Sequence, residues 1–532
     1  MLHSLELENF KAFGERACIP FAPITLIFGE NSAGKSSILQ ALNLLKQTRE
    51  SREPGVSLLP QSENGIVNLG SFKELLFDHD LQRTLSFRVE ATVSKRDIRR
   101  LPCQKNKIAI ELSFKRPSLK EEIFLDQIEV YFREPTRCIA RFRPFGTTKE
   151  TEESTTDFDS VPRSLLSSTS TEANCVWLTE EPEYWESEFE HCKQNKREIL
   201  RKLEENKSYL NAKSDSNPKN QENDKRLFQE ALGFLEEQID FLSSDFDLKN
   251  YISKRHSEEI NTVLILQSFL PVGIRRVNRN PIMLGDRPLA RLRYDDTVFD
   301  LNELAMAAGN ALDQVLVSLF PMGPFRRPPE RWYIFRGTSP QDVGYRGDLL
   351  PDLLYRRREL VKETNKWLER LEIGYELEVK PVKTDAGDLF EVRFIDTRRK
   401  KHVNVALPDV GFGISQLLPF VVQSLVSEER IISIEQPEVH VHPKLQADLG
   451  DLLVESVTRG NQIIVETHSE HLILRLQRLV YEKKIKPEDV SVIYVSRGPE
   501  GAEAQRLRLD EEGDFIDDWP DGFFPERLRE LR

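Results

Sequence analysis

Residues 24–42 of this 532-residue chain read ITLIFGENSAGKSSILQAL. Residues 24–28 are apolar apart from one threonine and are typical of a short buried strand, whereas the residues after Ser36 place apolar side chains at helical spacing. Between them, Gly29 to Ser36 fit the pattern G-x-x-x-x-G-K-[ST], whose glycines let successive backbone amides point at phosphate oxygens. The helix that follows presents its N-terminus to the same anion. This stretch therefore predicts a phosphate-binding loop in an α/β fold.

The side chains of this loop indicate which ligand it binds. Lys35 brings a positive charge to the β- and γ-phosphates of a nucleotide, and the Ser36 hydroxyl can ligate Mg²⁺. ATP and Mg²⁺ are therefore the predicted ligands. A purely structural glycine-rich turn is the alternative, but the strand before the loop and the helix after it disfavour it. The loop residues expected at the nucleotide are Gly29, Asn31, Ser32, Ala33, Gly34, Lys35, Ser36 and Ser37.

The opening of the chain also carries a family resemblance. Residues 5–15 read LELENFKAFGE, and together with the phosphate loop they resemble the head domains of SMC-like and OLD-family ATPases. The resemblance implies an ABC-type ATPase head, with a mixed sheet flanked by helices. In that group a basic residue after the first strand lies near the nucleotide, which implies this role for Lys11. An exposed lysine at a strand end is the alternative interpretation.

A second part of the expected site lies near the other end of the chain. Residues 431–438 read IISIEQPE, an apolar strand that ends in a carboxylate, as in a Walker B segment. A carboxylate there holds Mg²⁺ through its hydration shell, so Glu435 is expected beside the metal together with Ser36. The related ATPases usually have a second acid next, which acts as general base, but this chain has Gln436. An amide can only orient water, so we expect slow hydrolysis, with Glu438 as the nearest alternative base.

Two further segments resemble motifs of these ATPases. Residues 409–419, DVGFGISQLLP, resemble the signature segment, in which Gly413 would let backbone amides approach a phosphate and Ser415 would open a helix. In the family this segment reaches the nucleotide of the opposite subunit, which implies a homodimer or higher homo-oligomer closed around ATP. Residues 463–469, IIVETHS, resemble the segment with the switch histidine, so His468 is expected at the γ-phosphate. A capping histidine at a strand-to-helix turn is the alternative.

The composition favours a cytoplasmic protein without disulfides. No run approaches the ~18–20 apolar residues that cross a bilayer, and the N-terminal residues alternate like a strand instead of resembling a signal peptide. We therefore expect no membrane partner. The five cysteines are scattered without CxxC spacing, which argues against a disulfide framework and a zinc site. His440, His442 and His471 could suggest another metal site, but a dimer contact is the favoured interpretation of this segment.

The charge of the chain bears on nucleic-acid binding. The net charge is −13 at pH 7, whereas a protein that binds DNA over its whole surface is normally basic, because phosphate contacts supply most of the affinity. DNA binding would therefore need a partner or local patches. Ordinary solvated surface is the simpler interpretation of each basic cluster. The clusters are Lys95–Arg100, Arg275–Arg279, Arg326–Arg327 and Arg398–Lys401.

We expect three parts along the chain. Residues 1–146 form the N-terminal lobe of the head with the phosphate loop, and residues 303–532 form the C-terminal lobe with the other motifs. Residues 147–302 begin as a linker rich in serine, threonine and acidic residues and continue as a helical insertion that splits the head. Residues 513–528, GDFIDDWPDGFFPERL, resemble a C-terminal element of a bacterial ATPase subfamily described only as a domain of unknown function.

The biological role is expected from the resemblance alone. OLD-family nucleases carry a Toprim domain after the head, whereas only about 60 residues follow His468 here, so no nuclease activity is expected of this chain. Relatives with a stand-alone head, such as Septu-type phage-defence ATPases, hold or release a separate effector. The resemblance therefore implies an ATPase that regulates a nuclease or toxin partner in antiphage defence. The alternative is a DNA-repair or chromosome-associated SMC-like ATPase that clamps DNA.

Overall fold

A computed structural model of the chain forms two compact units. The first unit comprises Met1–Thr48, Leu59–Val89 and Gln314–Arg532, and the second comprises Arg49–Leu58 and Glu90–Asp313. The structure describes residues 1–51, 56–63, 65–98, 106–116, 122–131, 138–150, 169–177, 201, 204–205, 207–208, 260–267, 269–276, 283–284, 287–288, 297–382, 388–398 and 400–520.

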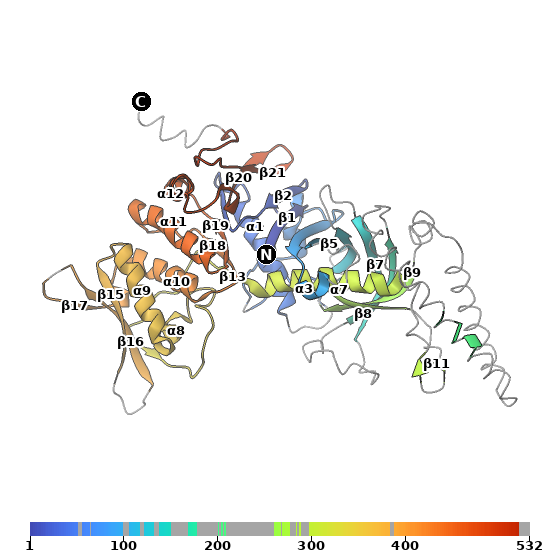
Figure 1. Ribbon diagram of the computed structural model, residues 1–532, viewed down its shortest axis with the longest axis horizontal. Helices are drawn as coiled ribbons and strands as arrows, with labels where there is room; N and C mark the ends of the chain where they lie inside the picture. The colour runs from blue at the N-terminus through green and yellow to red at the C-terminus, as the bar shows by residue number, and fades with distance from the viewer. Residues whose placement is uncertain are drawn as a thin grey trace. The chain divides into compact units, whose positions relative to one another are not determined.

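The main sheet of the first unit has six strands in the order β13-β18-β19-β3-β20-β21. The strands from β13 to β20 are parallel, and β20 and β21 form an antiparallel hairpin at the edge. Figure 1 shows β18, β19 and β20 close together, although they are joined by long connections. The strands are β3 (Ile24–Gly29), β13 (Leu319–Met322), β18 (Ile431–Glu435), β19 (Gln462–Glu466), β20 (Val490–Gly498) and β21 (Gly501–Leu507).

The apolar runs of these strands explain why they form the centre of the sheet. Every residue of β3 and of β19 is buried, as expected for strands of a parallel sheet that is covered on both faces. The predicted α/β class, with a mixed sheet flanked by helices, is confirmed.

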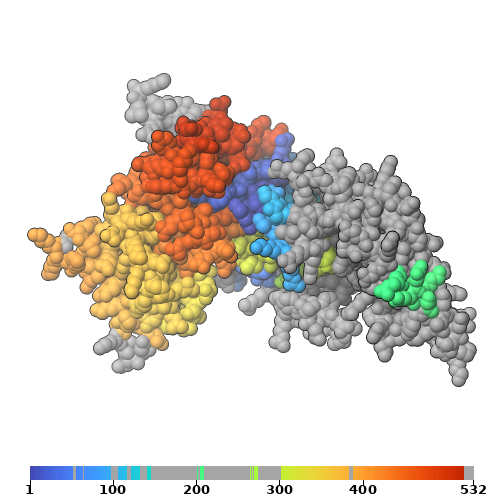
Figure 2. All heavy atoms as spheres, in the orientation of Figure 1, coloured from blue at the N-terminus to red at the C-terminus, as the bar shows by residue number. Residues whose placement is uncertain are grey.

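Four helices lie next to strands of this sheet in the sequence, either directly after a strand or directly before one. They are α1 (Lys35–Arg49), α10 (Phe412–Val426), α11 (Pro443–Thr458) and α12 (Glu470–Tyr481). The apolar residues of α12 recur at helical spacing and are buried, and this face packs against α11. In the space-filling view the outer sides of residues 443–481 form an orange-red surface (Figure 2).

A smaller antiparallel sheet belongs to the same unit. Its order is β14-β16-β15, and β17 pairs with β16. In β16, intermediate and buried residues alternate, so one face of the strand faces the core. The elements of this part are β14 (Tyr333–Ile334), β15 (Tyr375–Pro381), β16 (Leu389–Asp396), β17 (Val403–Ala406), α8 (Leu350–Arg356) and α9 (Arg358–Arg370). One continuous hydrophobic core joins this sheet to the main sheet.

The N-terminal strands of the first unit form a further layer. β1 (Leu2–Glu8) and β2 (Ala17–Pro20) are antiparallel, with Leu5 opposite Ile19. β4 (Leu85–Thr92), which begins in this unit, lies next to β1. The short helix α2 (Phe72–Leu75) follows Ser71, whose backbone N–H donates to Glu74 as in a capping box.

The second unit is an antiparallel meander in the order β10-β9-β8-β7-β6-β5. Its strands are β5 (Lys107–Lys115), β6 (Phe124–Tyr131), β7 (Cys138–Glu150), β8 (Thr169–Trp177), β9 (Ile260–Gln267) and β10 (Leu270–Arg276). Its remaining elements are α3 (Lys95–Ile98), the pair β11 (Met283–Leu284) and β12 (Arg287–Pro288), and α7 (Thr297–Ser318), whose last residues belong to the first unit.

The expected three-part organisation differs from the observed one at its boundaries. The predicted boundaries after residues 146 and 302 fall inside β7 and α7. Lys149 of β7 pairs with Ser170 of β8, so residues near the start of the range 147–302, predicted as a linker, form strands. Threonine-rich segments suit strands as well as loops. Most of the helical insertion predicted within residues 147–302 lies outside the described residues. Among the described residues, no helix has the length and apolar character needed to span a membrane.

Candidate nucleotide-binding site

The phosphate loop joins β3 to α1 through a backbone that only glycine can adopt at two positions. Gly29 has φ 141° and Gly34 has φ 111°, and a side chain at Gly29 would meet the backbone oxygen of Val495 at 2.0 Å. A side chain at Gly34 would come within 2.9 Å of Ala12 Cβ. The two glycines therefore allow a tight turn directly before the N-terminus of α1, as a phosphate-binding loop requires.

The side chains of Lys35 and Ser36 form hydrogen bonds within the loop and to β19. Lys35 is 4% exposed, and its Nζ donates to the backbone oxygens of Gly29 and Glu30 at 3.1 and 2.5 Å. Burial lowers the pKa of Lys35, while the charges of Glu466 and Glu30 act in the opposite direction. The Ser36 hydroxyl donates to Glu466 Oε1 at 2.8 Å.

Glu466 is a site residue that the sequence analysis missed. It ends β19, which lies between β18 and β3, and it is paired in register with Glu435. Its Oε2 is buried without a hydrogen-bond partner, and burial raises its pKa. The signal in the sequence was a second apolar strand that ends in a carboxylate, directly before the predicted switch histidine.

The two acids of the Walker B segment are half-buried and lie near Glu466. Burial, reinforced by the negative charge of Glu466, raises the pKa of Glu435 to about 7. Glu438 Oε1 accepts the backbone N–H of His468 at 2.7 Å, and Glu438 Oε2 is buried without a partner. Burial also raises the pKa of Glu438. The loop after β18 thus reaches the end of β19 through Glu438.

Gln436 turns the chain away from β18 immediately after Glu435. It has φ 46°, and its backbone N–H donates to the backbone oxygen of Glu466 at 2.7 Å. A non-glycine residue in the left-handed region costs roughly 1–2 kcal/mol, and such strain is typical of functional sites. The turn allows Glu438, two residues further on, to reach the segment at His468.

His468 follows β19 and lies near Lys35. Burial, followed by the positive charge of Lys35, lowers the pKa of His468. Its ring is edge-on to Phe28 of β3, with ring centroids 6.2 Å apart. The residue that caps α12 is Ser469, whose hydroxyl accepts the N–H of Leu472, so the alternative of a capping histidine does not hold for His468.

Lys11 contacts α1, the helix that follows the phosphate loop. Its Nζ donates to Gln40 Oε1 of α1 at 2.8 Å, and burial lowers its pKa. The next residue, Ala12, lies directly against Gly34. The segment therefore contacts the loop through Ala12, and the lysine binds the helix that follows the loop.

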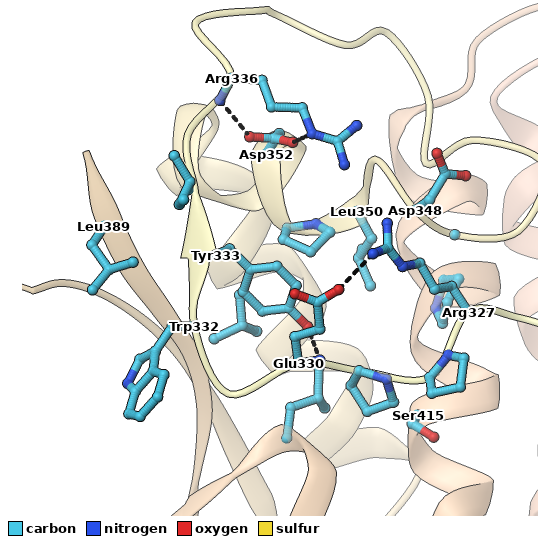
Figure 3. Close-up of a pocket in the computed structure, with 18 residues that line it drawn as sticks. Arg327, Glu330, Trp332, Tyr333, Arg336, Asp348, Leu350, Asp352, Leu389 and Ser415 are labelled. Atoms are coloured by element: carbon cyan, nitrogen blue, oxygen red, sulfur yellow. Dashed lines mark hydrogen bonds and ion pairs between the residues drawn. The ribbon is translucent and has the colours of Figure 1, made fainter.

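The segment predicted as the signature forms the start of α10. The helix begins at Phe412, after Gly411 as its cap, so Ser415 lies in its first turn and does not open it. A side chain at Gly413 would meet the backbone oxygen of His440 at 2.2 Å, so this glycine lets α10 approach the loop after β18. Ser415 lines a cavity of about 450 Å³ with residues of the 327–336 loop and of α8 (Figure 3).

Arg326 is a second residue near the candidate site that the sequence analysis missed. It was assigned to a basic surface cluster, but it is 5% exposed. Burial lowers its pKa to about 10 although the charges of Glu435 and Glu438 oppose this effect. The sequence carried no signal for this burial, because two adjacent arginines look alike in a sequence. In the structure the neighbouring Arg327 is exposed and pairs with Glu330.

The residues brought together fit a magnesium nucleotide. Unpartnered buried oxygens of Glu438 and Glu466, the Ser36 hydroxyl, the Lys35 ammonium and a glycine-containing loop before a helix N-terminus are the groups that Mg²⁺ and phosphates require. Among the described residues no group of three or more His, Cys, Asp or Glu side chains could hold a metal ion by itself. His440, His442 and His471 are thus not gathered into such a group, whereas a metal that also binds phosphate oxygens needs fewer protein ligands.

A family model described as an AAA ATPase domain matches residues 1–268 and 356–473 of the chain. The chain belongs to this family. A second model, described as a protein of unknown function (DUF3696), matches residues 485–532, which include the whole stretch 513–528 singled out from the sequence. No curated protein matches the chain.

Three solved structures are similar to this AAA ATPase domain at low identity. The Smc head domain from Pyrococcus furiosus, with an extended coiled coil and bound to the C-terminal domain of ScpA, is 12% identical, with a TM-score of 0.39 over 100% of this chain and 99% of that chain. The SMC head domain from Thermotoga maritima is 10% identical, with a TM-score of 0.34 over 95% and 98%. The Smc head domain from Pyrococcus yayanosii is 13% identical, with a TM-score of 0.36 over 95% and 97%.

The membership of the AAA ATPase domain family confirms the prediction of an ATP-binding ATPase that was made from the phosphate loop. The family model matches in two segments, one with the phosphate loop and one with the Walker B and switch segments. A closer relationship to OLD-family or Septu-type ATPases stays a prediction, as do the roles of the individual site residues.

Proposed function

We propose that this AAA ATPase domain binds ATP with Mg²⁺ at residues 29–37 and hydrolyses it slowly. The observation that carries the proposal is the contact between Ser36 and Glu466 at 2.8 Å, with Glu435 next to Glu466 in register. This contact joins the phosphate loop to two carboxylates at the C-terminal ends of parallel strands. Parallel α/β sheets bind ligands at these strand ends.

Each residue has a defined task in this proposal. Lys35 binds the β- and γ-phosphates, and Ser36 and Glu435 hold Mg²⁺, with Glu466 oriented by Ser36. When bound, Mg²⁺ neutralises the charge that develops on the phosphates. His468, whose pKa is lowered by burial and by Lys35, can donate a ring N–H to the γ-phosphate.

Slow hydrolysis follows from the residue after Glu435. Gln436 can orient the attacking water but cannot accept its proton. Glu438 is held by the His468 N–H and keeps one oxygen free, and its raised pKa suits a general base better than that of an exposed carboxylate does. We therefore propose that Glu438 is the base.

We further propose that the bound nucleotide joins two copies of the chain and that the joined form controls a separate effector, a nuclease or a toxin, in antiphage defence in the cytoplasm. The support for the dimer is the resemblance of residues 409–419 to a signature segment. The support for the effector is the resemblance to stand-alone ATPase heads. Clamping of DNA has less support, because the overall charge is −13 and Arg326 of one basic cluster is buried.

Lys35→Ala tests the nucleotide site. Removing the charge that the loop holds at the phosphates should reduce the affinity for an ATP analogue with Mg²⁺ at least 100-fold in isothermal titration calorimetry. Lys484→Ala, which removes an exposed lysine of the same unit, should leave the affinity unchanged. An unchanged affinity of the Lys35 variant would contradict the site.

Purification of the tagged wild-type chain together with the products of neighbouring genes tests the effector. A defined partner that stays bound after nuclease treatment would support the regulatory role. Salt-dependent binding to duplex DNA without any protein partner would instead favour the DNA clamp.

A further inference from the structure

Arg326 lies in the loop that follows β13, near the C-terminal ends of the parallel strands of the main sheet. β13 pairs in parallel with β18, so the chain leaves both strands at the edge where Glu435 lies. The backbone N–H of Arg326 donates to Gln416 Oε1 of α10 at 3.4 Å. The loop therefore lies between the carboxylates of the nucleotide site and the helix that carries Ser415.

The guanidinium of Arg326 is buried but only partly satisfied. Its Nη1 donates to the backbone oxygen of Pro324 at 3.1 Å, whereas Nε and Nη2 have no hydrogen-bond partner. These two nitrogens form one edge of the guanidinium plane, the edge that binds a carboxylate or a phosphate through two parallel hydrogen bonds. A charged pair of donors is costly to bury without acceptors, which indicates that a ligand with paired oxygens completes it.

The acidic neighbours of Arg326 do not complete this edge. The charges of Glu435 and Glu438 act on Arg326, yet neither bonds to its Nε or Nη2. Glu438 binds the His468 N–H instead. Glu435 interacts with the charge of Glu466, the acceptor of the Ser36 hydroxyl. The carboxylates near Arg326 are therefore the same ones that lie next to the phosphate loop through Glu466 and Ser36.

We propose that the free edge of Arg326 binds the terminal phosphate of an ATP molecule held by the phosphate loop of the same chain. This inference rests on the proposed nucleotide site and deepens it, because it names the group that distinguishes ATP from ADP. The γ-phosphate supplies the paired oxygens that the guanidinium edge requires, and ADP lacks that phosphate. Through Gln416, the loop that binds the phosphate also contacts α10, the helix expected at the second subunit.

The test is the affinity for a triphosphate compared with that for a diphosphate. Calorimetry with Mg²⁺ and either a non-hydrolysable ATP analogue or ADP should show that Arg326→Gln weakens binding of the analogue at least tenfold and changes ADP binding less than twofold. Arg327→Gln, which removes the adjacent exposed arginine, should change neither. An equal loss for both nucleotides, or no loss, would overturn the inference. Wild-type protein that binds neither nucleotide would contradict the proposed function itself.

A buried arginine also contributes to folding, so each variant is first compared with the wild type by circular dichroism and thermal unfolding. If Arg326→Gln does not fold, Arg326→Lys takes its place, because it keeps the charge and loses the planar pair of donors. A threefold or larger fall in the ratio of analogue to ADP affinity supports the inference, and a smaller one overturns it. If neither variant folds, hydrogen exchange on the wild type decides. Protection of residues 323–327 by the analogue but not by ADP supports the inference, and any other pattern overturns it.

Discussion

Gln436 is the residue at which this site departs from the pattern of related ATPases. Its left-handed backbone, φ 46°, and its N–H bond to the Glu466 oxygen hold the turn that follows β18. Its amide offers no group that accepts a proton, whereas Glu438 lies fixed by the His468 N–H. The rate of the proposed ATP hydrolysis therefore depends on whether Gln436 or Glu438 faces the attacking water.

Gln436→Glu should raise ATP turnover roughly tenfold or more, because it places a second carboxylate directly after Glu435, where the resemblance implies the base, and general-base catalysis contributes about 10²–10⁴. The backbone cost of the left-handed position is similar for glutamate and glutamine, so the fold should not change. Turnover is measured by phosphate release at saturating ATP. If the rate stays flat while Glu438→Gln abolishes it, Glu438 is the base; if Glu438→Gln has no effect, the proposed role of Glu438 is wrong.

The stability of the metal-free chain should depend on Glu435 and on pH. Burial and the charge of Glu466 raise the pKa of Glu435 from its ordinary value of 4.5 to about 7. The folded chain therefore binds this proton more tightly than the unfolded chain, and the resulting stability is present below about pH 4.5 and is lost as the pH rises through 7. In the presence of a chelator, Glu435→Gln should raise the Tm more at pH 8.5 than at pH 5.5, as measured by calorimetry.

Glu488→Gln is the matched control for this measurement, since Glu488 is exposed and its pairing with Lys486 is at the surface. The control should change the Tm little at either pH. A gain in Tm for Glu435→Gln that is equal at both pH values would show that Glu435 does not carry the pH dependence.

At the scale of elements, the strand β3, the phosphate loop and the helix α1 form one unit whose shape depends on two glycines. Gly29 is fully enclosed by β20, as its contact with Val495 shows. The loop therefore packs against the neighbouring strand and is not free to change its turn. The contact also explains why the loop keeps its shape next to a helix N-terminus that attracts anions.

Gly29→Ala should destabilise the chain strongly, by about 2 kcal/mol or more, because φ 141° is a region essentially limited to glycine and the added carbon would meet Val495 O at 2.0 Å. Thermal unfolding measures the loss. Gly411→Ala is the control, since Gly411 has φ −51° and nothing within 4 Å of the added carbon. Equal stability of the two variants would contradict the described loop geometry.

At the scale of the whole molecule, the order of the main sheet brings the ends of the chain together. β3 from the N-terminal part lies between β19 and β20 from the C-terminal part, so Ser36 and Glu466 meet although they are 430 positions apart. A nucleotide bound at this edge therefore contacts both segments that the family model matches. Because a nucleotide bound there binds only the folded chain, it should stabilise the first unit against unfolding.

Assembly tests the proposal at this scale. With an ATP analogue and Mg²⁺ the wild type should form a dimer in light scattering, and Gly411→Arg should stay monomeric because its large side chain covers the start of α10. Gly411 has open space around it, so the variant should fold normally. Glu488→Arg, at another surface, should dimerise like the wild type. A Gly411→Arg variant that dimerises fully, or a dimer that needs no nucleotide, would contradict the proposed arrangement.

Local chemistry was predictable from the sequence because strand, turn and helix signals are properties of neighbouring residues. Residues 24–42 and 431–438 indicated the phosphate loop, the α/β class and Glu435, and the apolar run before His468 indicated the strand beside them. The segments predicted as a linker and as the start of a helix at Ser415 were less well defined, since threonine-rich segments can pair as strands and a glycine can cap a helix earlier than expected.

The sequence by itself determined the phosphate-binding chemistry, because the pattern from Gly29 to Ser36 requires no distant residue. Only the tertiary structure decided which side chains complete it. Glu466 becomes the partner of Ser36 through the pairing of β19 with β3, and Arg326 becomes a buried donor through the packing around it. The physical reason is that burial and contacts between distant strands depend on the order of the sheet, which no local pattern records.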